Sequence, residues 1–242
     1  MIKLYCLCTP SHERLRDEWF LPTLKDEFEI HSRYLRQDGP GEYGDPSFRL
    51  AVRKKVEMIS EAIESNWGQI FIVSDVDIQF FEPITKLALE SMKDRDIMTQ
   101  NDGPTGLCCG FMVIRANRRT RRLFSSIQAL LQRDSKLTEQ PAFNAALKNH
   151  ELQAGTLAGD FFSPGVFLDG RGVSSTRDPF PAGWPFDERV GHCVWVPGAK
   201  LRIRRGLVMH HANFTLGLEN KLAQLDYVNK VVKTRERDRA LP

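Results

Sequence analysis

The sequence is poor in the features that mark secreted, membrane-spanning or zinc-ribbon proteins. Its 242 residues include five cysteines, and the pairs Cys6/Cys8 and Cys108/Cys109 are too closely spaced for a zinc ribbon or a C-x-x-C motif. The apolar runs are far shorter than a membrane span, and the chain opens on a strand-like segment instead of a secretion signal. We therefore expect reduced thiols, no membrane span and a cytoplasmic location.

Strong charge of either sign is also missing. A formal net charge of +3 is too weak to indicate a nucleic-acid partner, although it is compatible with an anionic small molecule. The sequence contains no internal repeat and no low-complexity linker, and hydrophobic residues make up an ordinary 41% of it. We therefore expect residues 1–242 to form a single domain with a full core.

Strand-like and helix-like segments alternate along the chain, which is typical of an α/β protein with a mostly parallel sheet flanked by helices. Strands are predicted at residues 2–8, 30–35, 70–73, 96–99, 110–114 and 208–211. Helices are predicted at residues 13–28, 47–65 (capped by Ser47), 120–132, 140–148 and 218–234. Residues 37–46 are rich in Gly and Pro and are expected to form a loop that closes over a ligand. Residues 160–197 have little periodicity, and such long irregular segments are usually functional.

Two carboxylates, Asp75 and Asp77, directly follow the most apolar predicted strand. Alternate residues of an extended chain face the same way, and ligands of open α/β sheets bind beyond the carboxyl ends of strands. Two such oxygens suit Mg²⁺ or Mn²⁺, which in turn can hold a diphosphate. The pair is therefore a candidate metal site. The alternative is that one Asp caps a turn and the other is solvated.

Two chemistries use this arrangement. In phosphatases of the haloacid dehalogenase type, Asp75 would be the nucleophile and Asp77 the acid/base, but the residue two positions further on is normally Thr or Val and is Gln79 here. That motif also usually lies on the first strand of its domain. The second chemistry is that of the D-x-D motif in glycosyltransferases that use nucleotide sugars.

Four later segments favour the second chemistry: CGFMVIR at 109–115, TEQPAFN at 138–144, FFSPG at 161–165, and HHANF at 210–214 with Gly217 and Lys221 behind it. With the D-x-D, they resemble the nucleotide-diphospho-sugar transferase family of GT-A fold, close to glycosyltransferase families 77 and 8. Members show a G-F-x-x-x-R strand, a D-Q helix start, and a terminal H-x-N followed by Gly and Lys. The resemblance covers roughly residues 1–230. It implies a single Rossmann-like GT-A domain, with donor binding at about 1–115 and the acceptor side at about 116–242.

The resemblance implies that Asp75, Asp77 and a late histidine hold the metal. His210 and His211 alternate across their predicted strand, so only one of them can face the site. The family's H-x-N matches His211-Ala212-Asn213, which favours His211 and leaves His210 for packing or for the acceptor side. An imidazole ligand favours Mn²⁺ over Mg²⁺, although Mg²⁺ remains possible.

The resemblance also implies roles in donor binding, for Thr9, Lys55, Asp75, Asn213, Gly217 and Lys221. Lys221 would neutralise a phosphate, and Gly217 would let the backbone approach the phosphates closely. Lys55 borders the apolar face of its helix, whereas Lys54 points away from it. On residue type alone, both Lys55 and Lys221 could equally be solvated.

Glu139 and Gln140 stand where the family often has Asp-Gln, which implies a catalytic place for both near the anomeric carbon. Glu139 could also be a first-turn acid that the helix dipole favours. Asp160, Asp169 and Trp184 are acceptor-site candidates, although Trp184, between Gly and Pro, could be a loop anchor.

The resemblance implies a metal-dependent glycosyltransferase that moves a sugar from a nucleoside diphosphate sugar, with a UDP-sugar as the expected donor, to a hydroxyl of an acceptor. Relatives in families 8 and 77 retain the anomeric configuration. Two alternatives stay open: a phosphatase with Asp75 as its nucleophile, and an inactive module that binds sugar nucleotides.

Overall fold

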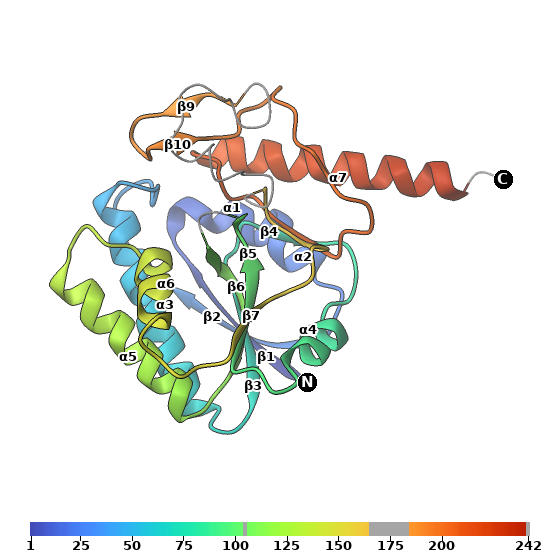
Figure 1. Cartoon of the computed structure of the whole chain (residues 1–242). Helices are drawn as coiled ribbons and strands as arrows, with labels where there is room; N and C mark the ends of the chain where they lie inside the picture. The colour runs from blue at the N-terminus through green and yellow to red at the C-terminus, as the bar shows by residue number, and fades with distance from the viewer. Residues whose placement is uncertain (104–105, 165–183, 241–242) are drawn as a thin grey trace.

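A six-stranded sheet runs through the centre of the computed structural model, which describes residues 1–103, 106–164 and 184–240 (Figure 1). Its strands are β1 (Ile2–Cys8), β2 (Phe28–Tyr34), β3 (Ile70–Ser74), β5 (Ile97–Asn101), β6 (Leu107–Arg115) and β7 (Ala154–Thr156). The order is β2-β1-β3-β6-β5-β7, and β6 runs antiparallel to its neighbours β3 and β5 while the other pairs are parallel. The prediction of a mostly parallel α/β sheet is confirmed. Asp169 lies outside the described residues.

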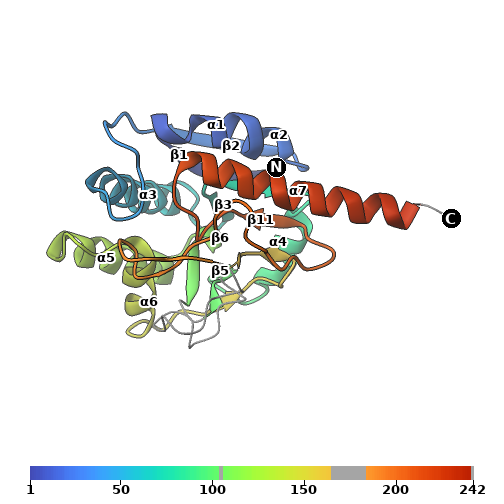
Figure 2. The same cartoon turned by 90° about the horizontal axis from the view of Figure 1, so that it is seen from above.

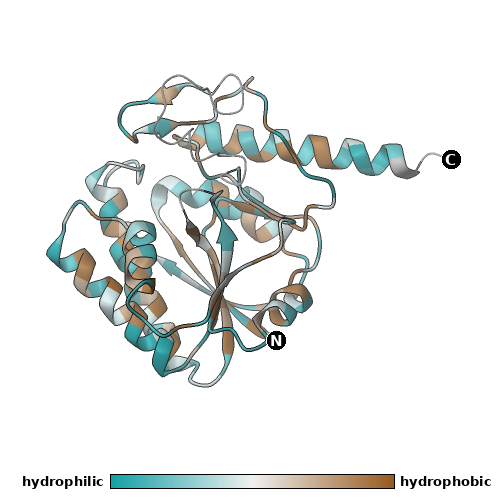
Figure 3. Ribbon diagram, viewed as in Figure 1, coloured by the Kyte–Doolittle hydropathy of each residue, from teal (hydrophilic) through white to brown (hydrophobic). Residues whose placement is uncertain are grey.

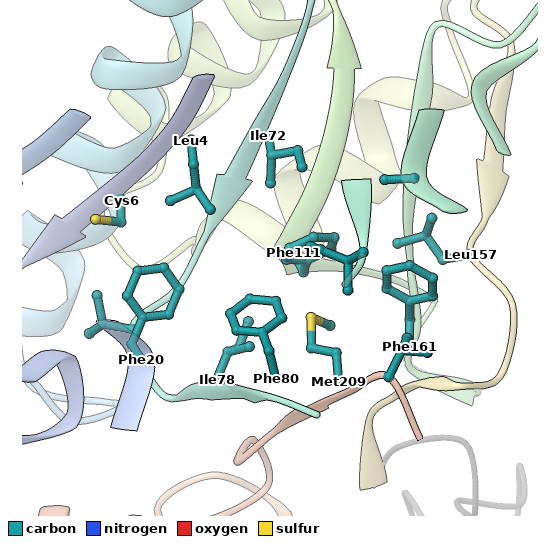
Figure 4. Close-up of a cluster of buried hydrophobic side chains, with 14 of the residues drawn as sticks. Leu4, Cys6, Phe20, Ile72, Ile78, Phe80, Phe111, Leu157, Phe161 and Met209 are labelled. Carbon is teal, nitrogen blue, oxygen red and sulfur yellow. The ribbon is translucent and has the colours of Figure 1, made fainter. Parts of the chain in front are cut away.

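Helices α3 (Pro46–Ser65), α5 (Arg118–Arg133) and α6 (Glu139–Leu147) cover one face of this sheet (Figure 1). The opposite face packs against α4 (Thr85–Met92) and against a smaller sheet of β4 (Ile78–Phe80), β11 (Met209–His211) and β8 (Phe161–Phe162). Figure 4 shows the hydrophobic core between the two sheets, in which Phe111 of the large sheet meets Phe80, Phe161 and Met209 of the small sheet.

The sequence of α3 shows why this helix forms and where it begins. Val52, Val56, Ile59 and Ile63 are buried on one face, at helical spacing. Asp45 caps the helix by accepting the Ser47 N–H at 2.8 Å, and Pro46 takes the first position. The prediction that Ser47 is the cap was wrong. Proline suits the first position because a backbone donor there has no partner within the helix.

The predicted helix 13–28 is broken into short pieces and ends earlier. The pieces are η1 (Pro10–His12), α1 (Glu13–Leu15), the π-helical turn η2 (Arg16–Phe20) and α2 (Leu21–Thr23), and Phe28 already begins β2. Pro22 lacks the N–H that a regular helix interior needs, which accounts for the irregular winding. Asp26 lies after the end of α2. Its carboxylate accepts hydrogen bonds from the N–H groups of Ile84 and Thr85, at 2.6 and 3.1 Å, and so stabilises the start of α4.

The other predicted elements are confirmed within a few residues, except that α7 (Leu218–Ala240) continues past its predicted end. α7 crosses above the sheet, and its C-terminal part extends beyond the body of the domain (Figures 1 and 2). A third hydrophobic cluster joins α7, through Val228, to Phe162 and Trp195.

Within the described chain, no helix combines the length and apolarity that a membrane crossing needs. The apolar positions, brown in Figure 3, gather on the central strands and the inner faces of the helices. All five cysteines are buried and free, as expected.

Candidate active site

A cavity of about 470 Å³ lies where β1 and β3 end and β6 begins. The predicted site residues on its wall are Asp75, Asp77, Glu139, Gln140, His211, Asn213, Gly217 and Lys221. Thr9 and Lys55 are buried behind the wall. The Thr9 hydroxyl contacts Ser11 Oγ at 3.0 Å and His12 Nδ1 at 3.1 Å, and these two residues line the cavity in its place. No motif in the sequence singled out Ser11 or His12 as residues of this wall.

The structure brings the three predicted metal ligands together. Asp75, Asp77 and His211 each offer one ligand atom, and these atoms lie within 4.8 Å of one another. β11 pairs antiparallel with β4, directly after the carboxylates, and the Ala212 N–H donates to the Asp77 carbonyl at 2.9 Å. His211 Nε2 consequently lies 3.2 Å from Asp77 Oδ1. Two carboxylates and an imidazole fit Mn²⁺, and fit Mg²⁺ less well.

Two lysines balance the two carboxylates. Lys55 Nζ lies 2.6 Å from Asp75 Oδ1 and 3.5 Å from Glu139 Oε1, and Lys221 Nζ forms an ion pair with Asp77 Oδ2. Burial alone would raise the pKa of Asp77, but Lys221 and His211 outweigh it and hold that pKa well below its usual range. Burial would lower the pKa of Lys55, but Asp75 and Glu139 raise it. Lys55 is therefore charged, and both ammonium groups contact carboxylates of the site.

Glu139 and Gln140 begin α6 at the edge of the same cavity. Burial raises the pKa of Glu139, and the nearby Lys55 only partly opposes this. The Gln140 amide is fixed at both ends, because its Nε2 donates to Asp102 Oδ2 at 3.1 Å and its Oε1 accepts the Cys109 N–H at 3.4 Å.

Asp102 is a central residue that the sequence reasoning missed. It is buried at the cavity wall, and its carboxylate accepts hydrogen bonds from Ser163 Oγ, from Asn213 Nδ2 at 2.9 Å and from Gln140 Nε2. It thereby joins three of the segments that carried the family resemblance. The only signal in the sequence was a polar stretch before the strand of Gly110, which did not single out Asp102.

His210 faces away from the cavity, into the core. It is fully buried, its Nδ1 accepts the Gln79 amide N–H at 3.1 Å, and its ring stacks on Phe162 with centroids 5.7 Å apart. Burial, with a smaller contribution from the neighbouring His211, lowers the pKa of His210 to about 3. Of the two positions expected for His210, packing or the acceptor side, its contacts are those of a packing residue.

Protonation of His210 should destabilise the fold in mild acid. The pKa of a histidine in an unfolded chain is about 6.5, which is above the pKa of His210 in the folded protein. The unfolded state therefore binds a proton first as the pH falls below about 6.5, and the free energy of unfolding declines from its full value above that pH. Between pH 7 and pH 5 this residue should remove about 2 kcal/mol from the free energy of unfolding. Urea unfolding of the wild type and His210→Gln at both pH values measures this, and an identical pH dependence of the two would disprove it.

The segment between β11 and α7 has two residues with positive φ. Gly217 has φ +85°, which suits glycine, whereas Phe214 on the cavity wall has φ +54°, which is uncommon for a bulky side chain. Such strained residues cluster at ligand-binding sites, where the surrounding structure maintains them.

Of the acceptor-site candidates in the described chain, neither Asp160 nor Trp184 lines the cavity. Trp184 is buried and its Nε1 donates to the Lys200 carbonyl at 2.9 Å, which is the contact of a loop anchor. The Asp160 carbonyl accepts the N–H groups of Val208 and Met209, just before and at the start of β11.

The predicted loop 37–46 forms part of the cavity wall through Pro40, Gly41, Glu42 and Tyr43. If this loop closes over a bound donor, chymotryptic cleavage after the half-exposed Tyr43 should slow when UDP and Mn²⁺ are added. UDP without metal serves as the control. Equal cleavage rates with and without both ligands would argue against a closing loop.

The profile of the nucleotide-diphospho-sugar transferase family matches residues 9–225. The chain therefore belongs to that family, which is a family of glycosyltransferases, and the resemblance drawn from the sequence is confirmed. No curated protein matches the sequence significantly.

Solved structures with a similar arrangement have low sequence identity to this chain. GlyE of Streptococcus pneumoniae TIGR4, a glycosyltransferase, is 11% identical with a TM-score of 0.45, and the match covers 66% of this chain and 46% of GlyE. A glycosyltransferase involved in glycosylation of the major capsid of PBCV-1 is 12% identical with a TM-score of 0.47, over 66% and 84% of the two chains. Mouse xyloside xylosyltransferase 1 is 12% identical with a TM-score of 0.45, over 88% and 97%. The chain thus corresponds to less than half the length of GlyE.

Proposed function

We propose that this protein is a metal-dependent glycosyltransferase. It moves a sugar from a nucleoside diphosphate sugar, with a UDP-sugar as the expected donor, to a hydroxyl acceptor, and it retains the anomeric configuration. The observation that carries the proposal is the convergence of Asp75, Asp77 and His211 on one cavity, within a chain that belongs to the nucleotide-diphospho-sugar transferase family.

In this proposal Asp75, Asp77 and His211 would hold Mn²⁺ or, less favourably, Mg²⁺. When bound, the metal supplies positive charge against the negative charge that grows on the departing diphosphate. Lys221 lies beside the same carboxylates and its ammonium can turn from Asp77 to a phosphate oxygen. Lys55 would act from behind the wall, where its ammonium contacts Asp75 and orients that carboxylate.

The remaining site residues would position the sugar. Glu139 and the fixed amide of Gln140 are assigned to the region of the anomeric carbon, and Asn213 is held there by Asp102 and Ser163. Thr9 would support the nucleotide end through Ser11 and His12, and Gly217 leaves room for the phosphates. The division into a donor part at about 1–115 and an acceptor part at about 116–242 stays a prediction, as does the cytoplasmic location.

Two other functions compete with this one. A phosphatase would need Asp75 as a nucleophile, and the family match is against it. An inactive module that binds sugar nucleotides would not need every charged group of the site, yet Asp75, Asp77, His211 and Lys221 are all present and directed at one cavity.

A thermal-shift panel of nucleotides, nucleotide sugars and simple phosphate esters, run with and without Mn²⁺, separates these functions. We expect a rise in melting temperature with UDP-sugars that requires Mn²⁺, and no rise with phosphate esters. Turnover of the bound UDP-sugar then distinguishes an enzyme from a binding module. Stabilisation by phosphate esters alone, or by no nucleotide sugar at all, would overturn the proposal.

A further inference from the structure

The Gln100 side chain is buried directly behind the His211 ring. Consecutive side chains of a strand point to opposite faces of the sheet, so Gln100 lies on the same face as Met98, which packs toward the small sheet that carries His211. At this point the pairing of β5 with β6 shifts register: Thr99 pairs with Met112 and Gln100 with Cys108, so the extra residues lie on β6. Bulges of this kind are common next to active sites.

The contacts of Gln100 fix which end of its amide faces the histidine. Gln100 Nε2 donates to the carbonyls of Phe161 and Phe162, at 3.4 and 3.2 Å. The reversed amide would place its oxygen against two carbonyl oxygens, with no proton between them. Gln100 Oε1 therefore faces His211 Nδ1, at 3.1 Å, and it can only accept a hydrogen bond there.

We propose that Gln100 is a positioning residue that keeps the proton of the His211 ring on Nδ1, so that Nε2 is the nitrogen available to a cation. This inference deepens the proposed function, because Nε2 is the atom that faces the Asp77 carboxylate, 3.2 Å away. A histidine that binds a metal usually donates its other N–H to a fixed acceptor, and loss of that acceptor typically costs about 10- to 100-fold in metal affinity.

The backbone on the other side of the ring limits its movement. A Cβ added to Gly110 would lie 2.1 Å from Cε1 of His211, so the ring packs directly on the glycine backbone of β6. The Cys108 thiol is a second polar group near Nδ1, but its Sγ is 3.8 Å away and already accepts the Gly110 N–H at 3.3 Å. Cys108 is thus a weaker partner for the ring than Gln100 and provides a matched control.

The test compares Gln100→Leu, which removes the acceptor, with Cys108→Ala. Long-range ¹H–¹⁵N spectra of metal-free protein at alkaline pH show which nitrogen of His211 is protonated. We expect a proton on Nδ1 in the wild type and in Cys108→Ala. In Gln100→Leu we expect it on Nε2, where it can be donated to Asp77. Mn²⁺ titration should show a 10- to 100-fold loss of affinity in Gln100→Leu and little change in Cys108→Ala.

An unprotonated Nδ1 in the wild type, or an unchanged ring in Gln100→Leu, would overturn the inference. A loss of Mn²⁺ affinity in Gln100→Leu without any change in ring protonation would mean that Gln100 acts only through packing, and would also overturn it. The ring spectra need no metal. If the wild type binds no Mn²⁺ but carries the Nδ1 proton that Gln100 controls, the proposed function fails while the role of Gln100 in orienting the ring stands.

Discussion

Replacing Asp77 by Asn is expected to abolish Mn²⁺-dependent binding of a nucleotide sugar while the chain stays folded. Asp77 is the carboxylate that both His211 and Lys221 contact, and an amide in its place supplies a far weaker oxygen ligand and no charge. The residue lies after the end of β3, in the turn to β4, so the sheet does not depend on it. Calorimetric titration with Mn²⁺, then with UDP, measures the loss, and circular dichroism measures the fold.

The matched control for this variant is Asp96→Asn. Asp96 is equally buried, and its carboxylate lies 2.9 Å from Arg119 Nε, but it precedes β5, at the opposite end from the cavity. Its replacement should cost about 1–3 kcal/mol of stability and leave Mn²⁺ binding unchanged. If Asp77→Asn instead unfolds the chain, and a well-packed neutral residue at the same position restores the fold, Asp77 is structural.

Replacing Lys221 by Ala should weaken the binding of UDP without weakening the binding of Mn²⁺ alone. The Lys221 ammonium is paired with Asp77 Oδ2, so a metal ion that binds alone must compete with it. Its removal should leave the affinity for Mn²⁺ alone unchanged or higher. The affinity for UDP in the presence of Mn²⁺ should fall by about 1.5–3 kcal/mol, because one charge-assisted hydrogen bond to the diphosphate is lost.

Lys230→Ala is the control for this prediction. Lys230 lies on the same helix, α7, but is exposed and pairs with Asp226 one turn away, so its removal should change neither affinity. Weaker binding of Mn²⁺ alone to Lys221→Ala, with UDP affinity unchanged, would show that Lys221 supports the carboxylates and does not meet the diphosphate.

The positions of Asp75 and Asp77 could be predicted because they depend on a local rule. A run of apolar residues identified β3, and its end placed the two carboxylates at the ligand-binding edge of the sheet. Alternation along β11 meant that only one of the two histidines could face the site, and the family's H-x-N pattern favoured His211. Lys55 was placed at the border of the apolar face of α3, but its residue type left a solvated position equally open, and the structure shows it buried.

The rest depends on contacts between distant segments. Asp102 is important because Gln140, Ser163 and Asn213 converge on it, and no local pattern brings these residues together. Gln100 contacts His211 because the small sheet brings β11 against the face of β5 that carries Gln100, a contact between segments more than 100 residues apart. The helix predicted at 13–28 was wrong at its end because the last helical piece stops at Thr23, directly after Pro22, and the chain enters β2 at Phe28.

The measurement that tests the metal site most directly is the Mn²⁺ affinity of His211→Ala beside that of His210→Ala, each with and without UDP. His211 lies with Asp75 and Asp77, whereas His210 is turned into the core. We expect His211→Ala to weaken Mn²⁺ and UDP together, since each ligand helps the other to bind, and His210→Ala to bind Mn²⁺ much as the wild type does. Loss of Mn²⁺ binding in His210→Ala, or wild-type affinity in His211→Ala, would contradict a metal site formed by Asp75, Asp77 and His211.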